Sequence, residues 1–168
     1  MITLRPATIH DLHTLQLWDE QPHNMASNPN GKWEWEAELP ETPEWREMLM
    51  AELDGRPIGF IQIIDPLLEE SHYWGDVPAN LRAIDIWIGM AGDLGKGYGT
   101  VMMQQALERC FANAQVTAVL IDPLSSNTRA RKFYERIGYR FVEYRIFGED
   151  HCAVYELTRE EWEGRRLP

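Results

Sequence analysis

Gly95-Lys96-Gly97-Tyr98-Gly99-Thr100 is the most informative segment of the chain. Three glycines at alternate positions allow a tight backbone turn and leave backbone N–H groups uncovered by side chains. An apolar run that predicts a strand, Ala83 to Gly89, precedes this loop, and a helical pattern from about Gly97 to Asn113 follows it. Uncovered N–H groups at the beginning of a helix form an anion site, so the loop predicts binding of a phosphorylated cofactor.

The spacing of the glycines excludes two better-known phosphate loops. A P-loop has a glycine five residues before its Gly-Lys pair, where this chain has Met90, and a Ser or Thr after the lysine, where this chain has Gly97. A dinucleotide fingerprint has its third glycine one residue later than here, and it has an acidic residue at the end of the next strand. Neither nucleotide-binding fold fits this pattern.

A second segment lies about thirty residues downstream and reads Asp122-Pro-x-x-x-Asn127-x-Arg129-Ala130-x-x-Phe133-Tyr134-Glu135-x-x-Gly138-Tyr139. Together with the Gly-x-Gly-x-Gly loop, it resembles the GCN5-related N-acetyltransferases (GNATs), which bind the pyrophosphate of acetyl-CoA on such a loop. The family's loop usually opens with Gln or Arg, but backbone amides do the binding, so a leucine is compatible with it. The resemblance implies acetyl-CoA as the cofactor, held by Leu94, Gly95, Lys96, Gly97, Tyr98, Gly99 and Thr100.

The length and composition predict one soluble domain. A chain of 168 residues with 44% hydrophobic content and seven Trp can form one packed core, and we expect a single domain over residues 1–168. No apolar run reaches the roughly twenty residues that span a bilayer, and Met1 to Arg5 has the pattern of a strand rather than of a signal peptide. We therefore expect a cytoplasmic protein with no membrane contact.

The formal net charge of −11 argues against nucleic acid as a partner, because nucleic-acid phosphates require a basic face. An acidic chain suits a cationic substrate, although solubility alone also explains the charge. The acidic residues gather in two stretches with the composition of loops: Glu34, Glu36, Glu38, Glu41 and Glu44, then Asp65, Glu69, Glu70 and Asp76. These stretches favour a multiply charged amine as the substrate.

The cysteines and histidines do not indicate a metal site or a disulfide. Cys110 and Cys152 lie in a predicted helix and a predicted strand without a Cys-x-x-Cys motif, and we expect them to be buried small apolar residues. His10 and His13 are three apart on a predicted helix, where they could share a metal, but a solvated helix face is the favoured interpretation. We expect no metal.

The remaining elements follow from hydrophobic periodicity and turn residues. Strands are expected over residues 2–5, 45–53, 57–64, 83–89, 117–122, 139–147 and 151–157. Helices are expected from a capping box at Thr8 to about Trp18, and over residues 97–113 and 126–137 with Gly138 as the cap of the last. Residues 21–42 are predicted to be irregular or only briefly helical, and residues 65–80 to form a loop.

An antiparallel first half with a hairpin at Asp54-Gly55, followed by a βαβ unit, predicts a mixed α/β sheet. The GNAT resemblance implies the same fold class. It implies a mostly antiparallel central sheet of about seven strands with flanking helices and a splayed pair of strands that bind CoA.

Further segments narrow the resemblance to the aminoglycoside 6'-N-acetyltransferases. They are Leu53-Asp-Gly-Arg-Pro-Ile-Gly-Phe-x-Gln62, Tyr73-Trp74, Arg82-Ala-Ile-Asp85 and the glycine loop itself. The acetyltransferases of hydroxamate siderophore synthesis share parts of the pattern. The likeness fades between about Met25 and Pro43, where those enzymes build part of the substrate pocket, so it does not identify the acceptor.

Asp85 is the first candidate catalytic residue. It lies in an otherwise apolar run, where a carboxylate is costly unless it faces a cavity or a partner, and a structural Asp paired with Arg or backbone amides explains it equally well. The resemblance implies that it receives the proton of the substrate ammonium or orients the amine. A carboxyl with a pKa of about 4 is a poor base for an ammonium of about 9, so we favour orientation with a proton relayed by water.

Tyr134 is the second candidate, and the resemblance implies that it protonates the CoA thiolate. A tyrosine with an ordinary pKa of about 10 can donate to a thiolate of about 8.5 without special tuning. The alternative is an aromatic core residue beside Phe133.

Other candidates contact the pantetheine arm or the substrate. The resemblance implies that the backbone at Trp87 and Ile88 binds pantetheine and that Asn127 forms a hydrogen bond with it, although Asn127 could be a plain N-cap. Asp122 could bind a second substrate ammonium or serve only as a turn residue before a proline. Three residues match substrate-side positions: Gln62, Glu70 and Trp74.

The leading interpretation is an acetyl-CoA-dependent N-acetyltransferase that acts on a primary amine of a cationic small molecule, with an aminoglycoside 6'-amine as the example. One alternative is an acetyltransferase for a siderophore hydroxylamine, a polyamine or another metabolite amine. Another is a non-catalytic acyl-CoA-binding module, against which the presence of both Asp85 and Tyr134 argues. The sequence is compatible with a monomer or a homodimer.

Overall fold

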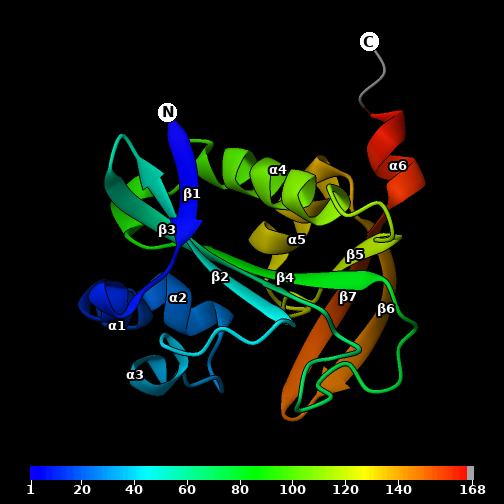
Figure 1. Ribbon diagram of the computed structural model, residues 1–168, viewed down its shortest axis with the longest axis horizontal. Coiled ribbons are helices and arrows are strands. Elements are labelled where there is room, and N and C mark those ends of the chain that lie inside the picture. Colours follow the sequence, from blue (N-terminus) through cyan, green and yellow to red (C-terminus); the bar gives the residue numbers. More distant parts are fainter. Residues whose placement is uncertain (166–168) are drawn as a thin grey trace. The chain divides into compact units, whose positions relative to one another are not determined.

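The computed structural model describes residues 1–165 of the chain. Seven strands are hydrogen-bonded in the order β1-β2-β3-β4-β5-β7-β6 (Figure 1). Strands β4 and β5 are parallel, whereas the pairs β1–β2, β5–β7 and β6–β7 are antiparallel. The mixed, mostly antiparallel α/β sheet predicted from the sequence is confirmed.

The strands are β1 (Ile2–Pro6), β2 (Arg46–Leu53), β3 (Arg56–Ile64), β4 (Leu81–Ile88), β5 (Ala118–Ile121), β6 (Arg140–Phe147) and β7 (Asp150–Thr158). The helices are α1 (Leu12–Asp19), α2 (Pro22–Ser27), α3 (Trp35–Glu38), α4 (Tyr98–Phe111), α5 (Thr128–Ile137) and α6 (Arg159–Gly164), with 3-10 turns η1 (Ile9–Asp11) and η2 (Ala91–Asp93). The predicted strands and helices are present, with ends shifted by about two residues at most. Helix α6 was not predicted, although the capping box of Thr158 and Glu161 at its beginning is a sequence signal for it.

The chain divides into two compact units, of which the first comprises Met1–Ile63 and Asp85–Ala106. In this unit α1, α2 and α3 lie on one side of the first strands and α4 on the other (Figure 1). Side chains alternate between these faces along β3. Phe60 joins the buried cluster of Leu15, Trp18, Trp35 and Met50, whereas Gly59 faces α4, where an added Cβ would lie 2.5 Å from Met102 Cε.

The second unit comprises Ile64–Ile84 and, among the described residues, 107–165. It contains the loop 65–80, which is held in place although it has no regular structure. The carboxylate of Glu69 accepts hydrogen bonds from the backbone N–H groups of Ser71 and Tyr73. Arg145 on β6 donates to the carbonyl of Trp74, whose indole is buried. The loop is therefore anchored to the β6–β7 hairpin.

The pairing of β4 with β5 is short. It runs from Leu81 opposite Ala118 to Ala83 opposite Leu120, whereas β4 continues to Ile88. The end of β4 thus extends beyond the residues that pair with β5. This geometry matches the splayed pair of strands that the resemblance implies.

The residues considered for metal or redox chemistry lie where the sequence suggested. Cys110 and Cys152 are buried, and burial raises the pKa of the Cys152 thiol to about 12. His10 and His13 are exposed. Over residues 1–165 no cluster of three or more His, Cys, Asp or Glu side chains could hold a metal ion. In the same range no helix combines the length and apolar character that a membrane span needs.

Candidate active site

Asp85 lies near the end of β4, half-buried, and its Oδ2 accepts a hydrogen bond of 2.8 Å from Gln62 Nε2 on β3. Two residues away on the same strands, the rings of Phe60 and Trp87 face each other with 4.7 Å between centroids. Because side chains two apart on a strand share a face, all four lie on one side of the sheet. The hydrogen-bond partner of Asp85 is a neutral amide, which leaves its negative charge available to a cation.

The surroundings of Asp85 change its acidity. Burial raises the pKa of the Asp85 carboxyl above its ordinary value, and the hydrogen bond from Gln62 opposes this shift. A raised pKa makes the carboxylate a better acceptor for the proton of an ammonium group. The direction of the shift therefore suits the role that the sequence suggested for Asp85.

An aromatic wall of Trp33, Trp35, Phe60 and Trp87 stands on the same face as Asp85. Trp33 stacks on Trp35 with 4.4 Å between centroids and 6° between planes, and it lies 5.7 Å from Trp87. Trp35 and Phe60 are buried, whereas Trp33 and Trp87 are half-buried, so that part of these two residues is accessible. Such a surface can pack against the apolar face of a small molecule.

The contribution of Trp33 and Trp35 to this wall was not predicted from the sequence. Both come from the segment around α3, where the family likeness fades. Trp35 Nε1 donates a 2.6 Å hydrogen bond to Asp19 Oδ2 on α1, which fixes the wall to the first helix. The Trp-x-Trp pattern was the available signal, but nothing in the sequence showed which face it would occupy.

The glycine loop has the backbone conformation that its sequence predicted. Gly95 and Gly97 have φ angles of 72° and 81°, a left-handed conformation that glycine adopts readily, and an added Cβ would meet no atom within 4 Å at either position. Helix α4 begins at Tyr98, and the first N–H groups of a helix have no partner within the helix. An open turn that leads into a helix N-terminus fits a diphosphate.

Charged residues anchor the loop on its N-terminal side. The buried Asp93 accepts bonds of 2.8 and 3.1 Å from the two Nη atoms of Arg56 on β3. Its Oδ1 also lies 3.5 Å from Lys96 Nζ. The hydrogen bond from Arg56 lowers the pKa of the Asp93 carboxyl, so this anchor stays ionised. The Lys96 side chain, predicted to bind cofactor, is thus tethered within the loop.

In the second unit Tyr134 lies on α5 with its ring buried. It packs edge-on against Phe133 at 5.2 Å and against Tyr139 at 5.9 Å between centroids. Asn127 precedes the same helix, and its Oδ1 accepts a 3.1 Å bond from the N–H of Ala130. Asn127 is therefore the N-cap of α5, and the capping bond uses only the oxygen of its side chain.

The predicted substrate-side residues of the second unit occupy different environments. Asp122 follows β5 and accepts a 2.5 Å hydrogen bond from the Tyr73 hydroxyl. Tyr73 also stacks on Phe147, with 4.5 Å between centroids, although no role was predicted for Tyr73. Trp74 is buried at 5.2 Å from Phe147, whereas Glu70 is exposed. Trp74 anchors the loop, and Tyr73 and Asp122 offer polar groups.

The predicted residues thus fall into two sets. Within the first unit the fold brings Gln62 to Asp85, and the backbone leads from Asp85 through Trp87 and Ile88 to the glycine loop. Within the second unit it brings Tyr73 to Asp122 and places Asn127 and Tyr134 on one helix.

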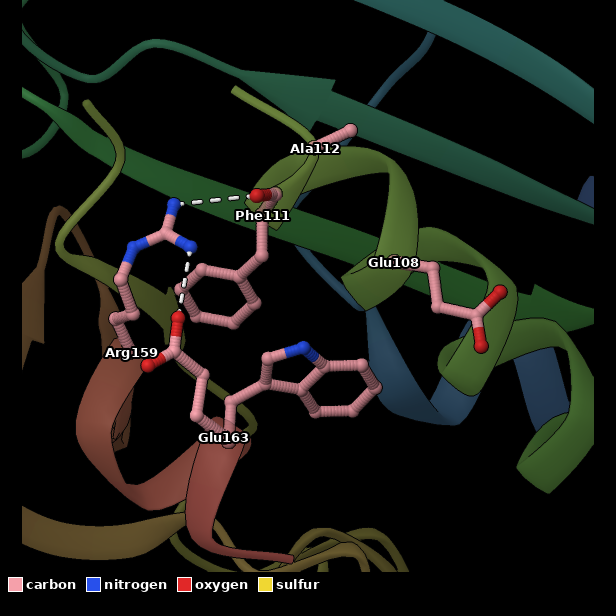
Figure 2. A pocket seen from close by; sticks show the side chains of 6 residues that line it. Glu108, Phe111, Ala112, Arg159 and Glu163 are labelled. Atoms are coloured by element: carbon pink, nitrogen blue, oxygen red, sulfur yellow. Dashed lines mark hydrogen bonds and ion pairs between the residues drawn. The ribbon is translucent and has the colours of Figure 1, made fainter. Parts of the chain in front are cut away.

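A pocket of about 390 Å³ in the second unit contains none of these residues. Figure 2 shows the Arg159 guanidinium directed at the carbonyl of Phe111 and the carboxylate of Glu163. The pocket is lined by Glu108, Phe111, Ala112, Arg159, Trp162 and Glu163. Arg159 donates a hydrogen bond to the backbone at the end of α4. We therefore infer that the residues of this pocket serve the packing of the structure rather than the binding of a ligand.

Comparison with known proteins identifies relatives over nearly the whole chain. The model of the acetyltransferase (GNAT) domain family matches residues 8–147. The aminoglycoside N(6')-acetyltransferase type 1 of Klebsiella pneumoniae is 30% identical, and the match covers 98% of this chain and 87% of that protein. The lysine N-acyltransferase MbtK of Mycolicibacterium paratuberculosis is 27% identical over 92% of this chain and 72% of that protein.

Solved structures share the fold. The aminoglycoside acetyltransferase AAC(6')-Ib, solved in complex with paromomycin and acetyl-CoA, matches with a TM-score of 0.87 and 28% identity over 99% of this chain and 98% of that chain. These matches confirm both the family resemblance and the fold class that were inferred from the sequence.

Proposed function

The chain belongs to the GNAT acetyltransferases, and we propose that it acetylates a primary amine of a cationic small molecule, such as the 6'-amine of an aminoglycoside. The observation that carries the proposal is Asp85, a half-buried carboxylate with a neutral partner, on the same sheet face as half-buried tryptophan rings. This combination suits an acceptor that has both a positive charge and an apolar ring face.

Acetyl-CoA, which the solved aminoglycoside enzyme holds, supplies the acetyl group as a thioester that amines can attack. In this chain the glycine loop, Leu94 to Thr100, would hold the diphosphate through backbone N–H groups. The backbone of Trp87 and Ile88, beyond the part of β4 that pairs with β5, would bind the pantetheine arm. The Nδ2 group of Asn127 would donate to the same arm, because its capping bond occupies the side-chain oxygen.

Asp85 would attract the ammonium form of the acceptor and orient it. The amine must lose a proton before it can attack the thioester, and the raised pKa of the Asp85 carboxyl brings it closer to that of an amine. We favour a relay in which water carries the proton while Asp85 stabilises the positive charge. Gln62 holds the Oδ2 atom of the carboxylate and would act as a positioning residue.

Tyr134 would donate its hydroxyl proton to the sulfur atom as the thiolate leaves. A phenol is slightly less acidic than a thiol, so the transfer to a thiolate is close to balanced at ordinary pKa values. The ring itself is held by Phe133 and Tyr139, which would fix the direction of the hydroxyl.

Features outside Asp85 favour an acceptor with several charges. The chain carries a net charge of −11, and Asp122 with its partner Tyr73 offers a second carboxylate. Trp33 and Trp87 offer ring surface to the sugar or cyclohexane faces of such a molecule.

A second candidate acceptor is the side-chain amine or hydroxylamine of a lysine derivative. The 27% identity to the lysine N-acyltransferase favours it. A flexible chain with one amine would use Asp85 but would gain little from the aromatic wall.

The test is release of CoA from acetyl-CoA by the purified protein with separate acceptors: kanamycin, a polyamine, lysine, N6-hydroxylysine and a peptide. We expect turnover with kanamycin at a kcat/KM at least about tenfold above the others, which corresponds to about 1.4 kcal/mol. A higher kcat/KM with lysine or N6-hydroxylysine would replace the leading acceptor by the second candidate. An absence of turnover with every acceptor would contradict the proposal.

A further inference from the structure

Two consecutive side chains of α2 hold the end of β4, and neither belongs to the predicted site. His23 Nε2 lies 2.9 Å from the carbonyl oxygen of Ile88. Asn24 Nδ2 donates to the carbonyl oxygen of Gly89 at 3.2 Å and to that of Trp18, at the end of α1, at 2.9 Å. Two successive carbonyls of the strand end are thus bound by two successive residues of one short helix.

The donors and acceptors at this corner are unambiguous. A carbonyl oxygen only accepts, so His23 Nε2 carries the hydrogen and donates it. Asn24 uses both hydrogens of its side-chain amide, and the residue is buried. Removal of either side chain leaves a partly or fully buried carbonyl without this donor, which costs more than an exposed hydrogen bond.

Other contacts hold the same peptide. The N–H of Gly89 donates to the carbonyl oxygen of Ile58 on β3 at 2.9 Å. An added Cβ on Gly89 would lie 2.0 Å from Trp18 Cε2, so α1 packs directly on the backbone here. The peptide between Ile88 and Gly89 is therefore held by His23 and by β3, and Asn24 holds the next peptide through the carbonyl of Gly89.

This part of β4 needs such support. Its pairing with β5 ends at Ala83, and its other neighbour in the sheet is β3. Farther along the chain, the ion pair of Asp93 with Arg56 anchors the start of the glycine loop. Between these points, the backbone at Trp87 and Ile88 leads into the glycine loop. The orientation of the Ile88–Gly89 peptide therefore determines where this backbone and the glycine loop lie.

We propose that His23 and Asn24 are positioning residues for the acetyl-CoA site: they hold the end of β4 and the approach to the glycine loop in the binding conformation. The inference rests on the proposed function, because it takes this segment to be the donor site. We call the contacts of His23 and Asn24 with these carbonyls the clamp. Loss of the clamp weakens acetyl-CoA binding, whereas acceptor binding at Asp85 depends on the Gln62 contact and is little changed.

The substitutions separate the effect of the hydrogen-bond donor from the effect of side-chain volume. His23→Gln keeps an N–H donor close to the position of Nε2, and we expect it to bind acetyl-CoA within about threefold of wild type. His23→Leu keeps the bulk without the donor, and we expect the Kd to rise about tenfold, the effect of a lost hydrogen bond to a largely buried carbonyl. Asn24→Asp places a carboxylate against two carbonyls and should raise the Kd further. His13→Leu, at an exposed histidine of α1, is the matched control.

The experiment combines calorimetric titration with acetyl-CoA and steady-state kinetics. We expect the KM for acetyl-CoA to rise in His23→Leu with the KM for the amine within about twofold, and the Gln variant to restore binding. Equal Kd values for His23→Leu and His13→Leu would overturn the inference. An equal rise in both KM values would also overturn it, because general destabilisation would produce that result.

A readout that needs no ligand separates this inference from the proposed function. Hydrogen exchange of the peptide covering residues 86–97 is measured in the unliganded wild-type, His23→Gln and His23→Leu proteins. We expect exchange about tenfold faster in His23→Leu only, with β2 and α4 unchanged. If the wild-type protein fails to bind acetyl-CoA, the proposed function fails, and with it the assignment of the clamp to a donor site. If exchange in His23→Leu equals that of wild type, the clamp itself is contradicted.

Discussion

Asp85 is a residue at which catalysis and stability should oppose each other. Burial raises the pKa of its carboxyl above the ordinary value of 3.8, so the folded chain binds this proton more tightly than the unfolded chain. For such an acid, stability is lost as the pH rises from the unfolded value through the folded one, and the loss is complete above the folded pKa. A structural aspartate in an ion pair would show the opposite sign.

We expect Asp85→Asn to melt at a higher temperature than wild type at pH 7, with the difference disappearing below about pH 4. The variant keeps an oxygen that can accept from Gln62. Its kcat/KM should fall by about 100-fold or more, because the charge that orients the ammonium is lost. Thermal melts at the two pH values and turnover with acetyl-CoA check both parts. A lower melting temperature at pH 7 would show that Asp85 is a structural residue.

Tyr134 can be tested against a neighbour of the same type. We expect Tyr134→Phe to lower kcat by about 100-fold through loss of the proton donor, while the buried ring keeps its packing. Tyr139→Phe is the matched control, because Tyr139 is also buried and contacts the Tyr134 ring. Acetyl-CoA turnover and binding are measured for both variants. Similar kcat values would refute the role of the Tyr134 hydroxyl.

At the scale of elements, the sequence allowed most of the fold to be predicted because local signals agreed with the tertiary structure. The turn at Asp54-Gly55 has φ angles of 50° and 87° and closes the expected β2–β3 hairpin. As predicted, a helical segment begins at the capping box of Thr8, and a helix ends at the left-handed cap of Gly138. The glycine loop lies between a strand and a helix, as its anion-binding interpretation required.

Residues 21–42 were expected to be irregular or only briefly helical, and the short helices α2 and α3 lie there, but their positions could not be predicted because they depend on packing. Helices α2 and α3 are too short for a clear periodic pattern, and helices of this length are not stable alone. Trp35 is held there by its stack with Trp33 and its bond to Asp19, contacts that no local pattern reveals. The clamp of His23 and Asn24 escaped prediction for the same reason: its partners lie 65 residues away along the chain.

The glycine loop offers a test at the same scale. Gly97→Ala places a side chain at a φ of 81°, which costs roughly 1–2 kcal/mol for an L-residue even though no atom obstructs the Cβ. We expect the Kd for acetyl-CoA to rise at least about tenfold as the loop changes conformation. Gly92→Ala in η2 is the control, since it also has open space but no positive φ. Calorimetric titration compares the two, and equal affinities would exclude the loop from the donor site.

For the whole molecule, the net charge of −11 predicts how the rate depends on salt. Long-range attraction of a cationic acceptor is screened as ionic strength rises. We expect kcat/KM for an acceptor with four or more amines to fall roughly tenfold between about 20 mM and 500 mM salt, and that for a monoamine to fall much less. Initial rates at subsaturating acceptor measure the effect. Equal salt dependence for both acceptors would mean that the acidic surface serves solubility alone.

We propose that the chain acetylates the 6'-amine of a polycationic acceptor. The decisive measurement is kcat/KM for two aminoglycosides that differ only in an amine or a hydroxyl at the 6' position, with the acetylated atom located by NMR. We expect turnover of the amine compound, acetylated at that nitrogen, and a kcat/KM at least about 1000-fold lower for the hydroxyl compound. Comparable values for both compounds, or acetylation at another nitrogen, would contradict it.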